Sequence, residues 1–210
     1  MQKNKISPAV VRRLPKYYRY LTRLVEENVE KISSSQLSEI TGFTASQIRQ
    51  DLNHFGGFGQ QGYGYKIKDL RASIEKIIGL NKSYDVVIVG YGHIGRAINK
   101  YGEFDTKAFN VLAAFDIPEK THKDGDLEIR PIEELAKFLE DNKVDIVILT
   151  VPKESAQEIS EVLKDKDIKG IWNFAPTDVE VEGVPVENIH LSESLYSLIY
   201  YMGNPEQYFK

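Results

Sequence analysis

Cysteine is absent from the 210-residue sequence, which excludes disulfide bonds, thiolate metal sites and redox sensing through thiols. The four histidines are scattered and none has the spacing of a metal-binding pair, so no metal site is expected. No apolar run approaches the ~20 residues of a membrane-spanning helix. The N-terminus is basic and polar, without the apolar segment of a secretion signal. These absences predict a cytoplasmic protein without a metal.

Charge is distributed unevenly along the chain. Residues 1–80 contain 13 Lys and Arg and 7 Asp and Glu, a net charge of +6, whereas residues 81–210 contain 14 and 24, a net charge of −10. A basic segment joined to an acidic one indicates that the first part meets a polyanion such as nucleic acid. Chance segregation of solvated charges is the alternative.

Residues 9–27 carry apolar side chains at helical spacing, which predicts an amphipathic helix. Pro15 lies inside this segment, so the helix either kinks there or begins there. The opposite side of the helix is basic, which adds to the case for a nucleic acid partner. Its basic residues are Arg12, Arg13, Lys16, Arg19 and Arg23.

Two short helices are predicted next, each with the same start signal. Ser33–Gln36 and Thr44–Gln47 both fit a capping box, in which a hydroxyl and an amide satisfy free backbone N–H groups of the first turn. Gly42 between them suits the left-handed residue that ends a helix. Helix, glycine-containing turn and helix is typical of a helix-turn-helix motif.

The second of these helices is the expected recognition helix. Ile48 and Leu52 fall on its inner side. The outer side keeps polar side chains of the kinds that hydrogen-bond bases and phosphates in a major groove. An ordinary solvated helix surface is the alternative. The outer residues are Ser46, Gln47, Arg49, Gln50 and Asn53.

Five glycines occur within residues 56–64 and alternate with aromatic residues. Glycine permits tight turns, and the aromatic side chains anchor flanking strands. Directly after a helix-turn-helix this pattern predicts a wing, a β-hairpin whose tip lies along DNA; a Gly-rich linker is the alternative. An amphipathic helix over 68–80 and a polar break at 81–83 then close the first domain. The candidate wing contacts are Gly59, Gln60, Gln61, Gly62 and Tyr63.

Apolar runs alternate with helical patterns in the rest of the chain, which predicts an α/β fold with a parallel sheet and right-handed crossovers. The expected strands are 85–89, 111–115, 145–151, 170–174 and 186–190, and the expected helices are 93–101, 132–140 and 155–163. A last apolar helix over 192–202 must be buried either on its own sheet or in a partner subunit. The sequence pattern of this helix is compatible with either location.

The first of these strands runs into a G-x-G-x-x-G turn formed by Gly90, Gly92 and Gly95. In a dinucleotide-binding fold the first glycine permits a sharp turn, the second a close approach to pyrophosphate, and the third close packing of helix on strand. Asp116 ends the next strand, 21 residues beyond the last glycine, where a carboxylate accepts hydrogen bonds from the adenosine ribose. It would repel a 2′-phosphate and no arginine follows it, so NAD(H) is favoured over NADP(H). A loop-capping carboxylate is the alternative.

Two further segments follow strands and are candidate borders of the cofactor. They are Thr150-Val151-Pro152 and Asn173-Phe174-Ala175-Pro176. Ligands of open α/β sheets bind at the carboxyl ends of the strands. The alternative is turn chemistry alone, because a residue before proline favours an extended exit from a strand.

Six segments of the chain form an ordered set: Arg13–Arg19, Ser46–Leu52, Phe58–Tyr65, Gly90–Gly95, Thr150–Pro152 and Gly170–Pro176. Together, over essentially the full length, they resemble the Rex family of redox-sensing transcriptional repressors. The resemblance implies a winged-helix DNA-binding domain over 1–82 and a Rossmann NAD(H)-binding domain over 83–190. It also implies a C-terminal dimerisation helix and tail over 191–210, exchanged between two subunits. Such a homodimer binds an inverted-repeat operator in double-stranded DNA and leaves it when NADH replaces NAD⁺.

The resemblance carries over to further positions. Tyr101 matches a family tyrosine near the nicotinamide. Arg19 matches an arginine that in some relatives pairs with an aspartate, and the position of that aspartate is His190 here, which is not an equivalent acceptor. Many relatives have basic residues where this chain has Gln60 and Gln61.

An NAD-dependent dehydrogenase with an accessory DNA-binding domain is the alternative function. The sequence has no Y-x-x-x-K pair and no zinc ligand set, and 115 residues follow Gly95, which is short for a substrate domain. No catalytic residue and no enzymatic activity are therefore expected. The candidate cofactor-binding residues are Gly90, Tyr91, Gly92, His93, Ile94, Gly95, Tyr101, Asp116, Thr150, Val151, Pro152, Asn173, Ala175 and Pro176. The candidate DNA-binding residues are Arg12, Arg13, Lys16, Tyr17, Ser46, Gln47, Arg49, Gln50, Asn53, Gly59, Gln60, Gln61, Gly62 and Tyr63.

Overall fold

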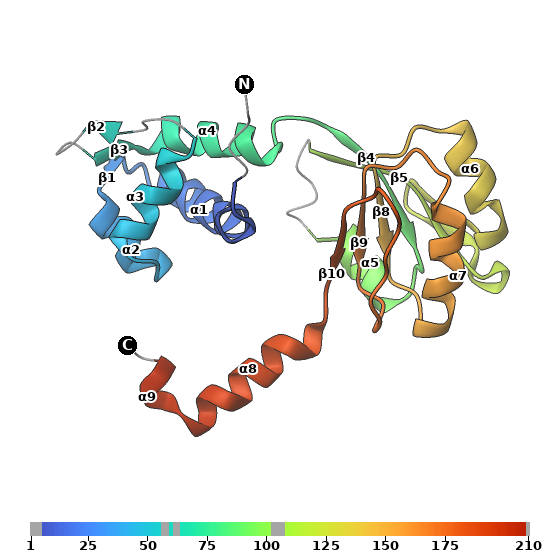
Figure 1. Ribbon diagram of the computed structural model, residues 1–210. Coiled ribbons are helices and arrows are strands. Elements are labelled where there is room, and N and C mark those ends of the chain that lie inside the picture. The colour runs from blue at the N-terminus through green and yellow to red at the C-terminus, as the bar shows by residue number, and fades with distance from the viewer. Residues whose placement is uncertain (1–5, 56–58, 61–63, 102–107, 209–210) are drawn as a thin grey trace. The chain divides into compact units, whose positions relative to one another are not determined.

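The chain divides into two compact units, Met1–Lys82 and Ser83–Lys210 (Figure 1). The computed structural model describes residues 6–55, 59–60, 64–101 and 108–208. The division falls within the polar break at residues 81–83. In the described part of the chain, no helix is both long enough and apolar enough to cross a membrane.

The first unit begins with the long helix α1 (Pro8–Glu26), which is capped by Ser7 and runs through Pro15. The alternative that this helix begins at Pro15 is therefore wrong. Pro8 is the first residue of α1, a position where a backbone N–H has no partner within the helix. Proline lacks that N–H and so loses nothing there, which favours a start at Pro8 over one at Pro15. The buried side of α1 is formed by Val10, Leu14, Tyr17 and Leu21.

The predicted helix-turn-helix is present as α2 (Ser34–Thr41) and α3 (Ala45–Asn53). Both capping boxes form, with Ser33 and Thr44 as the N-cap residues. Gly42 ends α2 with a φ of +75°, as expected for a left-handed C-cap. These local signals fix where each helix begins and ends.

A small antiparallel sheet and one further helix complete this unit. The strands are β1 (Lys31–Ile32), β2 (Gly59–Gln60) and β3 (Gly64–Lys66), in the order β1-β3-β2. Helix α4 (Ile67–Ile78) follows β3 and ends at Gly79. Strands β2 and β3 flank the tip of the predicted wing, whose residues 61–63 lie outside the described residues. Four helices and the paired strands β2 and β3 form a winged-helix arrangement.

The second unit is built on a seven-stranded sheet in the order β10-β9-β8-β4-β5-β7-β6. All neighbouring strands are parallel except β6 and β7, which form an antiparallel pair. The strands are β4 (Tyr84–Val89), β5 (Phe109–Asp116), β6 (His122–Asp124), β7 (Leu127–Pro131), β8 (Ile146–Leu149), β9 (Gly170–Asn173) and β10 (Val186–Asn188). The predicted strands are all present, with β8 shorter than expected, and the hairpin of β6 and β7 was missed.

Helices cover both faces of this sheet (Figure 1). Val87 and Val89 of β4 pack with α6 (Leu135–Asp141) and α7 (Lys153–Leu163), whereas Val86 and Ile88 face the side of α5 (His93–Asn99). Successive residues of a strand point to opposite faces, so an apolar strand needs cover on both sides. Short 3₁₀ turns, Pro118–Lys120 and Ile132–Glu134, follow β5 and β7.

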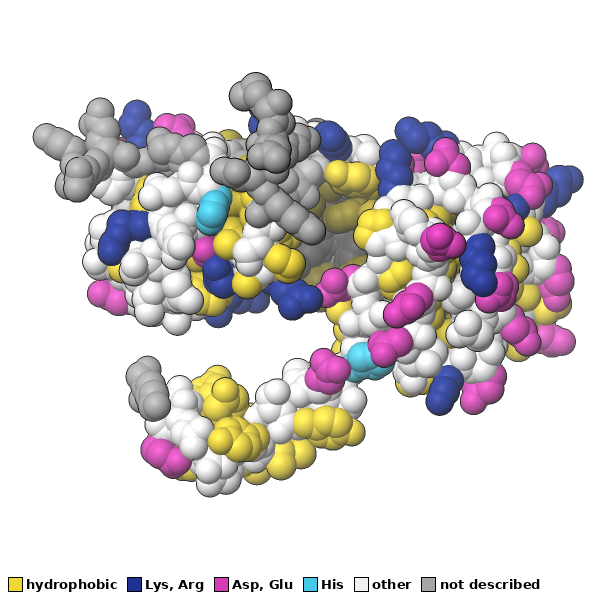
Figure 2. All heavy atoms as spheres, in the orientation of Figure 1, with side chains coloured by type: hydrophobic (Ala, Val, Ile, Leu, Met, Phe, Trp, Pro, Cys, Tyr) yellow, Lys and Arg dark blue, Asp and Glu magenta, His cyan; other side chains and the backbone are white. Residues whose placement is uncertain are grey.

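The last long helix, α8 (Leu191–Gly203), leaves its apolar side chains exposed and is followed by α9 (Pro205–Tyr208). None of its residues is buried, and Leu195, Tyr196, Leu198 and Ile199 are each more than half exposed. Figure 2 shows these apolar side chains along the helix. Of the two alternatives for this helix, burial on its own sheet is therefore not observed.

Candidate functional site

The glycine turn lies where the order of the sheet reverses, because β4 has β5 on one side and β8 on the other. Gly90 follows β4 and Thr150 follows β8. The backbone N–H of Thr150 donates to the carbonyl oxygen of Val89 at 2.8 Å, and its hydroxyl donates to the carbonyl oxygen of Gly90. Ligands of open α/β sheets bind beside such a reversal, at the carboxyl ends of the strands.

Two of the three glycines are required by packing, and the third faces open space. Gly90 has a φ of +92°, and a Cβ there would lie 2.7 Å from the carbonyl oxygen of Thr150. A Cβ on Gly95 would lie 2.3 Å from the carbonyl oxygen of Gly90. A Cβ on Gly92 would meet no atom within 4 Å. The backbone at Gly92 can therefore be approached closely, and the residues present fit a dinucleotide pyrophosphate.

Asp116 ends β5 and contacts the glycine turn directly. Its Oδ2 accepts the backbone N–H of Tyr91 at 2.8 Å, and its Oδ1 accepts the N–H of Ile117 at 2.8 Å. The Nζ of Lys120 lies 3.5 Å from Oδ1. Asp116 thus has the loop-capping role that was the alternative, and Oδ2, which accepts a single hydrogen bond, has a second lone pair for a ribose hydroxyl.

The side chain of Tyr91 is turned away from solvent and is 1% exposed. Its hydroxyl donates a hydrogen bond to Oδ2 of Asp124 at 3.1 Å and accepts one from Nδ2 of Asn99 at 2.9 Å. Burial raises the pKa of Tyr91, and the hydrogen bond from Lys100 lowers the pKa of Asp124. Only the backbone of Tyr91 thus remains a candidate ligand contact. No sequence pattern pointed to Asp124, because the hairpin that carries it was missed.

The loop after β9 is held by its own side chains. Asn173 is fully buried; its Nδ2 donates to the carbonyl oxygen of Thr177 at 2.7 Å and to Oδ1 of Asn188 at 2.8 Å. Its Oδ1 accepts the N–H of Ala175 at 2.9 Å. Ala175 and Val151 are buried as well. These three side chains therefore build the loops, and only the backbone of these residues remains a candidate for the predicted cofactor contact.

Other predicted cofactor residues are accessible. Along the turn and the neighbouring loops, His93, Ile94, Pro152 and Pro176 are exposed. Tyr101 is 55% exposed and follows Lys100, the C-cap of α5, so it lies just beyond the helix that it was expected to end. A ligand at the carboxyl ends of the strands can approach His93, Ile94, Pro152 and Pro176, whereas Tyr101 lies beyond the end of α5 that is away from the glycine turn.

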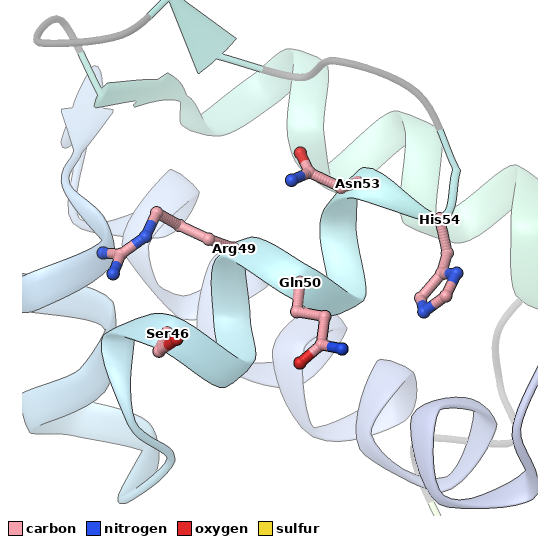
Figure 3. Close-up of a pocket in the computed structure, with 5 residues that line it drawn as sticks. All are labelled: Ser46, Arg49, Gln50, Asn53 and His54. Carbon is pink, nitrogen blue, oxygen red and sulfur yellow. The ribbon is translucent and has the colours of Figure 1, made fainter.

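The predicted outer side of the recognition helix is exposed. Ile48 and Leu52 of α3 are buried, and all five polar residues expected on the outside lie there. An open hollow of about 430 Å³ lies along this helix, and Figure 3 shows the side chains that line it. Its lining residues are Ser46, Arg49, Gln50, Asn53 and His54. His54 was not among the predicted residues. It follows the last residue of α3, so the helical pattern did not include it.

The basic residues of α1 differ in accessibility. Arg12 is exposed, and Lys16 is half-buried with its Nζ 4.7 Å from the ring centre of Phe43. Arg13 and Tyr17 both bind the carboxylate of Asp51 on α3. Because Tyr17 is fully buried, its predicted contact with DNA is replaced by this internal one. The wing residues Gly59 and Gln60 form β2, whereas Gln61, Gly62 and Tyr63 lie outside the described residues.

Two family models match the chain. Residues 5–53 match the model of a DNA-binding protein N-terminus, and residues 81–177 match that of a CoA binding domain. The chain is 54% identical over 204 residues to the redox-sensing transcriptional repressor Rex of Clostridium botulinum strain Alaska E43, covering 95% of this chain and 97% of the relative. It is 51% identical to Rex of Clostridium tetani, covering 98% and 99%. The chain belongs to the Rex family of redox-sensing transcriptional repressors.

Solved Rex structures match over nearly the whole chain. RSP in complex with beta-NAD+ and operator DNA is 46% identical with a TM-score of 0.89, covering 98% of this chain and 96% of RSP. RSP in complex with beta-NADH is 44% identical with a TM-score of 0.88, covering 97% of each chain. The predicted fold class and family are confirmed. The Rex relatives are repressors, so this chain is a regulator, and the dehydrogenase alternative is not favoured.

His190 is the residue that the resemblance sets opposite Arg19. It is the N-cap residue of α8 and lies with Nε2 2.9 Å from Oδ1 of Asp178. This hydrogen bond raises the pKa of His190. The guanidinium of Arg19 is exposed and lies 5.2 Å from the ring centre of Tyr20. His190 therefore has a carboxylate partner of its own.

Proposed function

We propose that this chain is a homodimeric transcriptional repressor that binds operator DNA, leaves it when NADH binds, and so senses the NADH/NAD⁺ ratio. The observation that carries the proposal is the open side of Gly92 at the carboxyl ends of β4 and β8. The complexes of RSP with beta-NAD+ and operator DNA and with beta-NADH support both ligands. We place the protein in the cytoplasm, where bacterial DNA and NADH meet.

NAD(H) binding uses the backbone of the glycine turn and the free acceptor capacity of Asp116. Gly92 gives the pyrophosphate access to backbone N–H groups, and Asp116 accepts hydrogen bonds from the adenosine ribose. The bound cofactor supplies a nicotinamide ring that is positively charged in NAD⁺ and neutral in NADH. Tyr101 is the proposed neighbour of this ring, with the exposed prolines Pro152 and Pro176 at the border.

DNA binding uses the outer side of α3, the exposed part of α1 and the wing. Arg49 and Gln50 are exposed in the hollow of Figure 3 and have the side chains that recognise guanine and adenine edges. Arg12 and Lys16 are the proposed contacts to the phosphate backbone. The wing contributes through residues 59–63. A two-fold dimer would then contact two half-sites of an inverted repeat.

Dimerisation through α8 accounts for its exposed apolar side. Leu198 and Ile199 are 52% and 55% exposed, and an apolar surface of this kind marks a contact with another chain. We therefore propose that α8 of one subunit packs on its partner. In this scheme residues 1–82 bind DNA, residues 83–190 bind NAD(H), and residues 191–210 form the dimerisation helix and tail.

Release of DNA requires only that NADH binds the DNA-free state of the dimer more tightly. Typical coupling energies of about 1–3 kcal/mol change operator affinity by roughly 5- to 150-fold. Linkage demands that operator weakens NADH binding by the same factor.

A mobility shift on an inverted-repeat operator, with NAD⁺ and NADH titrated separately, tests the proposal. We expect NADH to release the DNA at concentrations at which NAD⁺ does not. A second titration measures NADH binding to the protein with and without operator. Equal NADH affinity in both would reject the switch.

A further inference from the structure

The inner side of the recognition helix carries a buried charge. Asp51 of α3 is 2% exposed and lies beside Ile48 and Leu52, which form the rest of that buried surface. Burying a carboxylate is unfavourable, and replacing a buried ion pair by apolar residues of similar size is often neutral or stabilising. Packing alone therefore does not account for a charge on this side of α3.

Two side chains of α1 bind the carboxylate. Nε and Nη2 of Arg13 donate to Oδ2 and Oδ1 of Asp51, both at 2.7 Å, and the hydroxyl of Tyr17 donates to Oδ2 at 2.7 Å. Burial alone would raise the pKa of Asp51, but the hydrogen bonds from Arg13 and Tyr17 outweigh it and hold that pKa below its ordinary value. The carboxylate therefore stays charged at neutral pH, and one helix supplies all three of its donors.

The same stretch of α1 also holds the turn that precedes α3. The ring of Tyr17 packs edge-on against Phe43, with ring centres 5.5 Å apart. The Nζ of Lys16 lies 4.7 Å from the centre of the Phe43 ring, within the range of a cation–π contact. Helix α1 therefore contacts the recognition helix at two places. One is the turn before its first residue, through Phe43, and the other is its inner side, through Asp51.

The geometry points to Asp51 as a positioning residue, which through Arg13 and Tyr17 fixes the orientation of α3 relative to α1 and so directs the outer residues of α3 at DNA. A bidentate pair of guanidinium and carboxylate fixes an angle as well as a distance. Apolar contacts are not directional, so they hold two helices together without fixing that angle. The inference rests on the proposed contact between α3 and operator DNA.

Arg13 is then a positioning residue too, although a basic residue on α1 also fits a phosphate contact. Replacing Arg13 with lysine distinguishes the positioning role from the phosphate contact. A lysine at this position would still neutralise a phosphate, but it has no planar guanidinium for a bidentate pair with Asp51. The two roles also differ in salt dependence, because each phosphate contact adds about 0.9 to the slope of log K against log[salt].

The first experiment replaces the network without leaving a buried charge unpaired. The triple variant Arg13→Met, Tyr17→Phe and Asp51→Leu should fold, and its thermal midpoint should equal or exceed that of the wild-type chain. Its operator affinity should fall about tenfold, as for the loss of one well-aligned base contact. Its discrimination between operator and unrelated DNA should fall in parallel.

The second experiment compares neighbouring arginines on α1. Arg13→Lys should weaken operator binding with an unchanged salt slope. The matched control, Arg12→Ala, removes an exposed charge and should lower the salt slope by about one unit while keeping the preference for operator. A cycle of Arg13→Ala, Asp51→Ala and the double variant should show a coupling of about tenfold in operator affinity, within the range for contacting residues.

Wild-type operator affinity and discrimination in the folded triple variant would overturn the inference. So would an Arg13→Lys variant that binds as the wild-type chain does, because Arg13 would then act as a simple phosphate contact. Absence of operator binding by the wild-type chain itself would reject the proposed function, and the inference with it. The two failures are therefore distinguishable on one operator fragment.

Discussion

One added methyl group at Gly92 should separate ligand binding from folding. The φ of Gly92 is −78°, outside the left-handed region that favours glycine, and a Cβ there would meet no atom within 4 Å. The free energy of unfolding of Gly92→Ala should therefore stay within about 0.5 kcal/mol of the wild-type value. It could rise by up to about 1 kcal/mol, because alanine reduces the entropy of the unfolded chain.

The same methyl group fills the space through which a pyrophosphate approaches the backbone. Overfilling a close-packed contact costs about 1–3 kcal/mol, so NADH affinity should fall roughly 5- to 150-fold. Binding is measured by titrating NADH into the protein and following its fluorescence. The NADH concentration that releases operator should rise by the same factor, whereas operator binding without NADH should be unchanged.

Gly95→Ala is the matched control, because it places the same group in an occupied position. Its Cβ would lie 2.3 Å from the carbonyl oxygen of Gly90 and 3.0 Å from Oγ1 of Thr150, so α5 must shift on the sheet. We expect a loss of at least about 1–3 kcal/mol of stability, seen as a lower thermal midpoint. In both variants the NADH concentration that releases operator should rise, but only Gly95→Ala should lose stability.

Two results would refute this reasoning. A stable Gly92→Ala variant that binds NADH as tightly as the wild-type chain would mean that the open side of the turn is not the pyrophosphate site. Equal destabilisation of Gly92→Ala and Gly95→Ala would mean that the contacts described around the two glycines are wrong.

Three further predictions concern other parts of the chain. Asp116→Asn removes a negative charge and releases Lys120, whose Nζ now lies 3.5 Å from the carboxylate, so NADPH should release operator at a lower concentration from this variant than from wild type in a mobility shift. The hydrogen bond to Asp178 raises the pKa of His190, so an NMR titration should give a pKa above the ordinary value in the wild-type chain and the ordinary value in Asp178→Asn. The contribution of this pair to the stability of the folded chain is present below about pH 6.5 and is lost as pH rises through the pKa of the folded state. Arg49→Ala should cost about 1–3 kcal/mol and relax specificity at one base if Arg49 contacts a base edge, whereas an even loss over all sequences with a reduced salt slope would indicate a phosphate contact.

Local patterns were sufficient for much of the fold. The capping boxes at Ser33 and Thr44 and the glycine at position 42 predict the helix boundaries, because each depends on side chains within three residues of the helix end. The apolar strands and the glycine turn likewise predict a parallel sheet and its ligand-binding edge. The hairpin of β6 and β7 was missed because β6 contains no apolar residue and β7 alternates apolar and charged residues, so neither strand forms an apolar run.

The candidate site was less predictable, because burial depends on tertiary contacts. A polar residue on a helix is expected outside, yet Asp51 is inside because Arg13 and Tyr17 approach it from a helix about 35 residues earlier in the chain. Asn173 follows a strand at the ligand-binding edge, as a ligand contact would, but its hydrogen bonds fasten its own loop. Sequence proximity to a site identifies the loop, and only the fold identifies which side chains face the ligand.

The division of α3 into an anchored side and an exposed side has an evolutionary consequence. Arg49, Gln50 and Asn53 are exposed and are not members of the hydrophobic core of the first unit, so exchanging them should cost folding little beyond the hydrogen bond that Arg49 donates to Ser34 at 2.9 Å. Ile48 and Leu52 are part of that core and are constrained by it. A lineage can therefore acquire a new operator preference by changing a few outward side chains, while the supporting framework and the sensor domain are inherited intact.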